Sequence, residues 1–198
     1  MDGIIAKKFD ITLIVEGARV DSADKELYKK MWDAGVRMIS YGIESANPDV
    51  LEFYNKNITL EQVRKAVKLA YDTGFFITAS FIMGAPFETK KHFENTIDFA
   101  CSLPIDFVEF YILDYRVGST LWKNAVENEI IHKNDFFIRS CKENNLSQFS
   151  LNDLVKWRKK AYTKFYLRPH YLLRESVKLI KSGNLNLLKA TFPIITKI

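Results

Sequence analysis

Three glutamates come directly or shortly after runs of branched and aromatic residues, and they give the first indication of chemistry. They are Glu16, Glu44 and Glu88. Carboxylates in such positions can accept hydrogen bonds from a ligand or serve as general acid and base. Lys56 lies twelve residues beyond Glu44 and could bind the carboxylate of a ligand. The simpler alternative is a surface ion pair between Lys56 and one of these glutamates.

Other kinds of active site find little support in the residue types. The histidines His92, His132 and His170 do not have metalloprotease spacing, and no Gly-x-Ser-x-Gly motif is present. The two cysteines, Cys101 and Cys141, exclude a disulfide framework and any four-thiolate metal centre made by this chain alone. We therefore expect a reducing compartment and predict a cytoplasmic protein.

Charge is distributed unevenly along the 198 residues. Residues 1–132 hold 15 basic and 20 acidic residues, and residues 133–198 hold 14 basic and 4 acidic ones. The basic part could bind nucleic acid, anionic lipid or the acidic part of its own chain, and charge alone does not choose among these partners. Because the uncharged apolar stretch at residues 75–87 contains Gly84 and Pro86 and is too short for a membrane helix, no membrane span is expected.

The elements that must position these residues follow a repeating pattern. Four apolar runs alternate with amphipathic stretches, and they cover residues 11–15, 38–43, 75–83 and 107–113. This order indicates βα units with a parallel sheet, whose sites lie at the carboxyl ends of the strands. The repeat stops near Ile131. A capping pattern at Ser150 predicts one helix, and a second is expected from His170 to Lys181, ending at Gly183 before an apolar tail to Ile198.

Two motifs at predicted strand ends carry a family resemblance. They are Tyr41-Gly-Ile-Glu-Ser45 and Phe81-Ile-Met-Gly-Ala-Pro-Phe-Glu-Thr89, and Asn55-Lys56 and Gly118-Ser-Thr120 follow in matching order. With them the chain resembles the radical S-adenosylmethionine (SAM) enzymes over about residues 10–122. The resemblance is to the branch with a partial six-stranded (β/α) barrel, which is often found behind a cobalamin-binding domain.

The resemblance implies a SAM-binding role for seven residues. Glu44 would accept hydrogen bonds from the ribose hydroxyls, Glu16 would lie near the methionyl ammonium, and Lys56 would meet the cofactor's carboxylate. Apolar and small residues would complete the wall around ribose and adenine. These are Ser80, Ile82, Gly84 and Ile112. For Glu88 we favour a structural role at the start of the following helix.

The sequence departs from the family pattern in one respect that bears on activity. The three-cysteine loop that holds the family's 4Fe-4S cluster is not present, and alignment by Glu16 places residue 1 just before the family's third strand. We therefore predict an incomplete (β/α) barrel of about four parallel units in residues 1–132, with a basic helical extension in residues 133–198.

The functional expectation has the same two parts. The chain would keep part of the SAM-binding wall but would not cleave SAM alone. The cluster would come from a separate chain or from a missing N-terminal segment, so that the protein would be part of a split or truncated enzyme.

Two alternative functions stay open. One is a non-catalytic scaffold that docks an anionic partner through Lys156, Arg158, Lys159 and Lys160. The other is a different βα-barrel enzyme that uses Glu16, Glu44 and Glu88 as acid and base.

Overall fold

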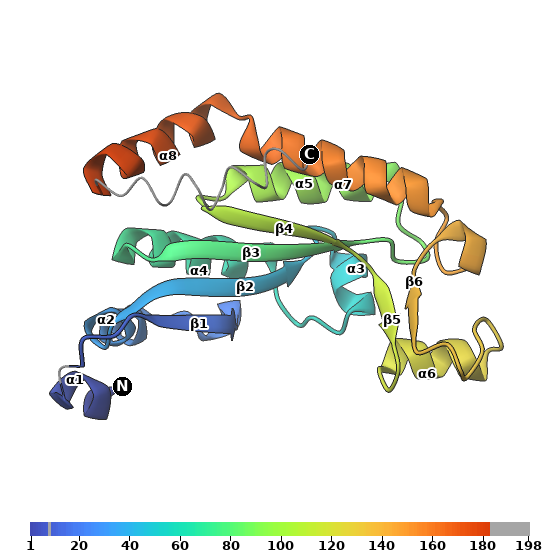
Figure 1. The fold of residues 1–198 in the computed structure, drawn as a ribbon, viewed down its shortest axis with the longest axis horizontal. Coiled ribbons are helices and arrows are strands. Elements are labelled where there is room, and N and C mark those ends of the chain that lie inside the picture. Colours follow the sequence, from blue (N-terminus) through green and yellow to red (C-terminus); the bar gives the residue numbers. More distant parts are fainter. Residues whose placement is uncertain (8, 183–198) are drawn as a thin grey trace.

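The computed structural model describes residues 1–7 and 9–182, and in it four parallel strands form one sheet (Figure 1). The strands are β1 (Leu13–Ala18), β2 (Val36–Glu44), β3 (Phe76–Met83) and β4 (Phe107–Ile112), and they pair in that order. The expected parallel βα arrangement, an incomplete barrel of four units, is thereby confirmed. Within the described residues, no helix has the length and apolar character needed to cross a membrane.

Helices connect the strands and follow them. In chain order they are α1 (Asp2–Lys7), α2 (Lys25–Asp33), α3 (Pro48–Phe53), α4 (Leu60–Thr73), α5 (Lys90–Ser102), α6 (Thr120–Glu127), α7 (Leu151–Tyr166) and α8 (Pro169–Ser182), with short 3-10 turns at Val20–Ser22 and Lys142–Asn144. The start of α4 shows how the sequence sets these limits. The Thr59 hydroxyl accepts from the Gln62 N–H, the Gln62 side chain accepts from the Thr59 N–H, and Gly74 ends the helix at φ 100°.

The two faces of the sheet have different surroundings. One face is covered by helices, and its residues are almost completely buried, including Ile39, Ile77, Phe81 and Phe110. The opposite face, which we call the open face, carries the alternate residues of each strand. Two rows of it cross the sheet in register: Ser40, Thr78 and Phe107, and then Gly42, Ser80 and Glu109. Because side chains alternate along a strand, the open face presents a separate, more polar set of groups.

The C-terminal part joins the same core. A small antiparallel pair, β5 (Asp114–Arg116) with β6 (Phe137–Arg139), connects residues on both sides of the predicted boundary at residue 132. Helix α7 lies along the β4 edge, and its Leu154, Ala161 and Phe165 are buried in the core shared with the sheet. The division into 1–132 and 133–198 stays a prediction about organisation, and residues of both parts contribute to one hydrophobic core.

Most element predictions lie close to the observed bounds. The four predicted strands and the helix capped by Ser150 are present, and the Ser150 hydroxyl accepts from the Asp153 N–H. The sequence reading did not include α1 or the β5–β6 pair, because strands of three residues leave no periodic signal. The predicted helix end at Gly183 and the tail to Ile198 lie outside the described residues.

Candidate functional site

Glu44 and Lys56 form an ion pair at the carboxyl end of β2. The Lys56 Nζ lies 2.9 Å from the Glu44 Oε1 and also donates to the Gly42 carbonyl at 3.1 Å. A Cβ on Gly42 would lie 2.7 Å from the Glu44 carboxylate and 3.2 Å from the Lys56 ammonium. The pair therefore lies over Gly42, and a side chain at this position would displace it. Sequence reasoning did not single out Gly42, although it stands inside the Tyr41–Ser45 motif.

The backbone of Glu44 has an uncommon conformation. Its φ is 68°, in the left-handed region that non-glycine residues rarely adopt, and the β2–β3 register is irregular at this point. A hydrogen-bond network holds the next residues. Asn47 donates through its amide to Ser45 and to the His92 carbonyl, and Thr96 of α5 bonds to the Ser45 hydroxyl. The turn after β2 is thus fixed to α5, and this fixes the direction of the Glu44 side chain.

A pocket of about 280 Å³ opens beside this pair. Its walls come from the end of β1, the end of β2 and the loop between α3 and α4. They include Gly17, Arg19, Asp21, Asn55 and Asn57. The site therefore lies where parallel α/β sheets usually bind ligands, at the carboxyl ends of neighbouring strands.

The predicted residues Glu16 and Ser80 share the open face with this pair but do not line the pocket. Glu16 follows Val15, which packs on the helix side, so that Glu16 alternates to the open face, where it is exposed. Ser80 lies next to Gly42 in register and is half-buried. Ile82 follows on the same side and packs against a second cluster that contains Phe53 and Tyr54.

Gly84 and Ile112 do not line the pocket beside Glu44. Gly84 needs its φ of 110°, but a Cβ on it would meet Leu154 and Ser140 of the C-terminal part and would not point toward a ligand on the open face. Ile112 is paired with Met83 and is buried in the main core, because Glu109 and Tyr111 take the open-face positions of β4. The role of Ile112 as an apolar wall for adenine stays a prediction.

Glu88 holds the turn after β3 from inside the protein. It is 1% exposed, and its Oε2 accepts from the N–H groups of Gly84 and Ala85 at 2.6 and 2.8 Å. Burial raises the pKa of Glu88 to about 7, although both backbone hydrogen bonds favour the ionised form. Glu88 was expected to have a structural role, and in the structure its carboxylate accepts hydrogen bonds from the backbone of the turn. The cap of α5 is Thr89.

Two buried polar atoms near this turn have no hydrogen-bond partner in the described part of the chain. They are the Tyr54 hydroxyl and the Glu88 Oε1. Burial raises the pKa of Tyr54 well above its usual range, and the carboxylates of Glu88 and Glu44 add to this effect. Tyr54 was not identified from the sequence, because a tyrosine at the end of a short amphipathic helix gives no functional signal of its own.

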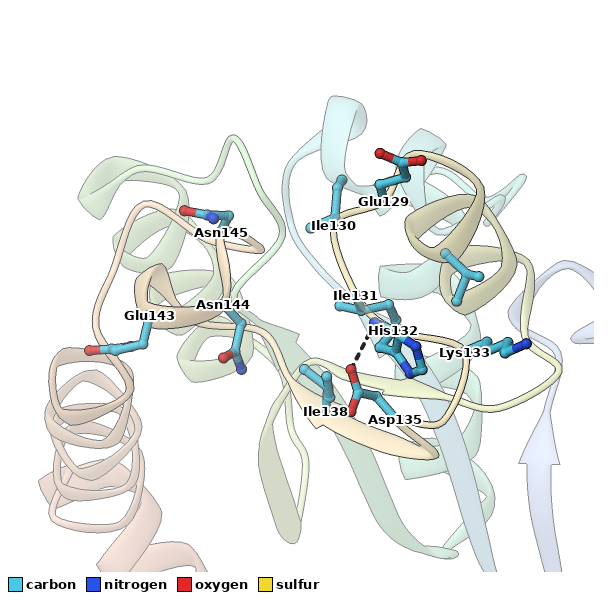
Figure 2. A pocket seen from close by; sticks show the side chains of 11 residues that line it. Glu129, Ile130, Ile131, His132, Lys133, Asp135, Ile138, Glu143, Asn144 and Asn145 are labelled. Atoms are coloured by element: carbon cyan, nitrogen blue, oxygen red, sulfur yellow. Dashed lines mark hydrogen bonds between the residues drawn. The ribbon is translucent and has the colours of Figure 1, made fainter.

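A larger cleft lies elsewhere, between α6 and the turn after β6 (Figure 2). Its volume is about 620 Å³, and Glu129, His132 and Glu143 are among its lining residues. In Figure 2 Asp135 accepts from the backbone N–H of His132, at 2.8 Å. None of the predicted site residues lines this cleft, which is widely open to solvent, so that its size does not make it the functional site.

The chemistry of the pocket beside Glu44 fits SAM better than it fits an iron–sulfur cluster. SAM carries a carboxylate, an ammonium and ribose hydroxyls, and Lys56 and Glu44 supply the charges and acceptors that bind such groups. The two thiols are on different elements, with Cys101 half-buried on α5 and Cys141 buried before the turn that follows β6. Two separate thiols do not make a cluster site of the kind that cysteine-rich loops form.

Comparison with known proteins identifies the family. Residues 2–100 match the Radical SAM superfamily. The chain is 36% identical over 160 residues to an uncharacterized methyltransferase of Pyrococcus horikoshii, covering 80% of this chain and 35% of that protein. It is 38% identical over 73 residues to the anaerobic magnesium-protoporphyrin IX monomethyl ester cyclase of Cereibacter sphaeroides, covering 37% of this chain and 12% of that protein. This chain therefore spans about a third or less of these relatives.

A solved structure supports the fold. The radical S-adenosylmethionine methyltransferase TsrM of Kitasatospora setae superposes with a TM-score of 0.51 and 20% sequence identity, over 56% of this chain and 23% of that one. At this identity the likeness concerns the arrangement of strands and helices. Since the family match extends over half of the sequence and the parallel sheet agrees with it, the chain belongs to the radical SAM superfamily.

Proposed function

We propose that this chain binds SAM on the open side of its sheet and that the thiolates of the 4Fe-4S cluster come from polypeptide outside the 198 residues. The observation that carries the first part is the Glu44–Lys56 pair, held over Gly42 by a strained backbone. The second part rests on thiol number and placement, since two separated cysteines cannot supply a three-cysteine loop. The chain would then bind and orient the cofactor without cleaving it alone.

The geometry assigns separate tasks to the residues of the pocket. On binding, the Lys56 ammonium would leave the Glu44 carboxylate and pair with the carboxylate of the cofactor. Glu44 would then be free to accept hydrogen bonds from the ribose hydroxyls. Glu16 would attract the methionyl ammonium from the neighbouring strand. SAM and the cluster together supply radical chemistry in complete enzymes, while the protein binds, orients and excludes water.

The two edges of the sheet differ, and the difference supports a partner for β1. In the described residues β1 pairs with β2 on one side only, and its Ile14 is 56% exposed. At the other edge, tyrosines of α7 bond to the backbone of β4. A separate chain or a preceding segment that carries the cluster would therefore add its strands at β1.

Binding of S-adenosylhomocysteine tests the cofactor proposal by calorimetry. The compound keeps the carboxylate, ammonium and ribose groups that the pocket would contact. We expect Glu44→Ala to weaken binding at least about tenfold, because it removes the ribose acceptor and frees Lys56 from its position. Glu52→Ala, at an exposed glutamate on α3, is the matched control and should bind as the wild type does. Equal affinity of all three proteins would contradict the proposal.

Metal analysis tests the cluster proposal independently. The purified chain, reconstituted anaerobically with iron and sulfide, should retain no stoichiometric cluster after desalting. Stoichiometric iron and acid-labile sulfide on this chain alone would overturn the second part and leave the first part standing.

A further inference from the structure

A further pocket, which we call the α4–α8 pocket, lies at the opposite end of the sheet from Glu44 and Lys56. Its volume is about 400 Å³, and its walls come from α4, the loop between α5 and β4, and the first two turns of α8. That loop comes directly before β4, whereas Glu44 is at the carboxyl end of β2. The two pockets are therefore separated by about the length of a strand, which is about 20 Å for the six residues of β4.

The charged side chains that line the α4–α8 pocket are of one kind. Arg64 and Lys68 reach it from α4, and His170 and Arg174 reach it from α8. Among the residues that the structure describes, no aspartate or glutamate lines this pocket. Basic side chains that converge on one cavity from two helices raise the local concentration of anions. The lining therefore indicates an anionic ligand.

Arg64 is held in position without a carboxylate partner. Its Nη1 donates to the Ser102 hydroxyl at 3.0 Å, and its guanidinium lies 4.7 Å from the centre of the Phe99 ring. The Ser102 hydroxyl donates in turn to the Phe99 carbonyl at 2.7 Å. Within residues 1–7 and 9–182, Arg64 forms no ion pair. The guanidinium is thus oriented by neutral groups, and its other N–H groups are available to a ligand.

The other cations are positioned by carboxylates that do not line the pocket. Lys68 pairs with Asp72 at 2.7 Å. The Arg174 side chain is only 11% exposed, and it lies 2.7 Å from the Glu175 carboxylate and 3.5 Å from that of Asp106. These carboxylates compensate part of the positive charge behind the lining. Arg64 carries the charge that they leave uncompensated.

The donors of this pocket suit a phosphate better than a carboxylate. A guanidinium can bind two phosphate oxygens with parallel hydrogen bonds, and a further oxygen remains for a second base. Arg64 and Arg174 are on different helices, so that they can approach different oxygens of one group. Tyr71, which is 41% exposed, lines the same pocket together with Leu103 and Pro104. Such aromatic and apolar groups can cover the apolar part of a small molecule.

We propose that the α4–α8 pocket binds a small molecule that carries a phosphate group and an aromatic or apolar part. Arg64 would bind two phosphate oxygens, Lys68 and Arg174 would supply further donors, and the ring of Tyr71 would pack on the apolar part. Because the sheet separates this pocket from the one beside Glu44, binding here does not depend on SAM.

The test compares probes that share a benzene ring and differ in charge. Phenyl phosphate, benzoate and benzyl alcohol are titrated into the full chain at constant ionic strength and followed by NMR. We expect phenyl phosphate to bind at least about fivefold more tightly than either other probe, and Arg64→Gln to weaken its binding at least about fivefold. Arg116→Gln, at an exposed arginine on β5, is the matched control and should bind as the wild type does. Equal affinity for phenyl phosphate and another probe, or equal losses in the two variants, would overturn the proposal.

Two more substitutions separate the geometry of the site from its charge and from misfolding. Arg64→Lys keeps the charge but not the planar fork, so that its affinity for phenyl phosphate should lie between those of the wild type and Arg64→Gln. Affinity equal to that of the wild type would contradict binding through two parallel bonds. Lys68→Gln, at an exposed residue, should weaken binding at least about twofold and provides the same test if Arg64→Gln loses its circular dichroism.

Vesicles distinguish a soluble ligand from a lipid headgroup. The full chain is sedimented with phosphatidylcholine vesicles that contain phosphatidic acid. We expect the vesicles to retain no more wild-type protein than Arg64→Gln protein. Retention of the wild type that is lost in Arg64→Gln would overturn the assignment to a small molecule, because the phosphate would then belong to a lipid.

Discussion

Gly42, Glu44 and Lys56 illustrate how single residues build the pocket. The strained φ of Glu44 turns its carboxylate back over β2, and the bare backbone of Gly42 leaves room for the Lys56 ammonium. Such strain costs about 1–3 kcal/mol and persists where surrounding contacts hold it. Here Ser45, Asn47 and Thr96 provide those contacts.

Gly42→Ala should therefore impair the pocket more than the fold. The new methyl group would lie too close to the Glu44 carboxylate and would displace the pair. We expect S-adenosylhomocysteine affinity to fall about tenfold, with a loss of less than about 1 kcal/mol in unfolding free energy because the pair is partly exposed. Calorimetry and urea denaturation measure the two quantities. Gly3→Ala, where nothing lies within 4 Å, is the control, and equal losses of affinity in both variants would contradict this account.

Glu88 should make stability depend on pH near neutrality. Its pKa is raised from 4.5 to about 7 by burial, so the folded state binds a proton more tightly than the unfolded state does. The contribution of this proton to the free energy of unfolding is fully present below pH 4.5. It is lost as pH rises through 7, and it amounts to on the order of 3 kcal/mol in total. Urea denaturation between pH 5 and 8 should show the loss in the wild type and not in Glu88→Gln. Parallel curves of unfolding free energy against pH for the two proteins would refute the assignment of this pH dependence to Glu88.

At the scale of elements, α7 protects one edge of the sheet with hydroxyl groups. The Tyr166 hydroxyl accepts from the Val108 N–H and donates to its carbonyl, and the Tyr162 hydroxyl bonds to the Phe110 backbone in the same way. The Tyr171 hydroxyl donates to the Asp106 carbonyl. These side chains take the backbone groups that a further strand would use, so that the β4 edge is closed.

Tyr166→Phe should weaken this edge measurably. It leaves the buried Val108 N–H and carbonyl without a partner, which costs about 1–3 kcal/mol. Urea denaturation should show that loss, and hydrogen exchange at the Val108 amide should become faster. Tyr71→Phe removes a hydroxyl from an exposed ring on α4 and should change stability by less than about 0.5 kcal/mol. Similar effects of both substitutions would argue against edge capping.

The sequence was sufficient for the repeating elements and insufficient for contacts between them. The capping residue Ser150 and the apolar runs mark elements locally, and these predictions agree with the structure. From the sequence alone, the tyrosines of α7 indicate no more than one face of an amphipathic helix, because their hydrogen-bond partners lie more than fifty residues away in the chain. The burial of Ile112 in the main core was not evident for a related reason, since the alternation that buries it depends on the register with β3.

At the scale of the whole molecule, the sheet has one closed and one available edge. Described residues near β1 include Phe9, Ile11 and Ile14, each about half exposed. Chains with such an edge tend to associate through it unless another strand covers it. This asymmetry agrees with the proposal that cluster-bearing polypeptide adds at β1, since β4 offers no equivalent surface.

The isolated chain should therefore associate with itself through β1. We expect sedimentation velocity to show a concentration-dependent dimer, and Ile14→Lys to raise its dissociation constant at least about tenfold by placing a charge on the open side of that strand. Leu173→Lys, at a residue that is 66% exposed on α8, is the matched control and should leave association unchanged. If Leu173→Lys dissociates the dimer and Ile14→Lys does not, association involves the C-terminal helices, and the argument for a partner at β1 loses its basis.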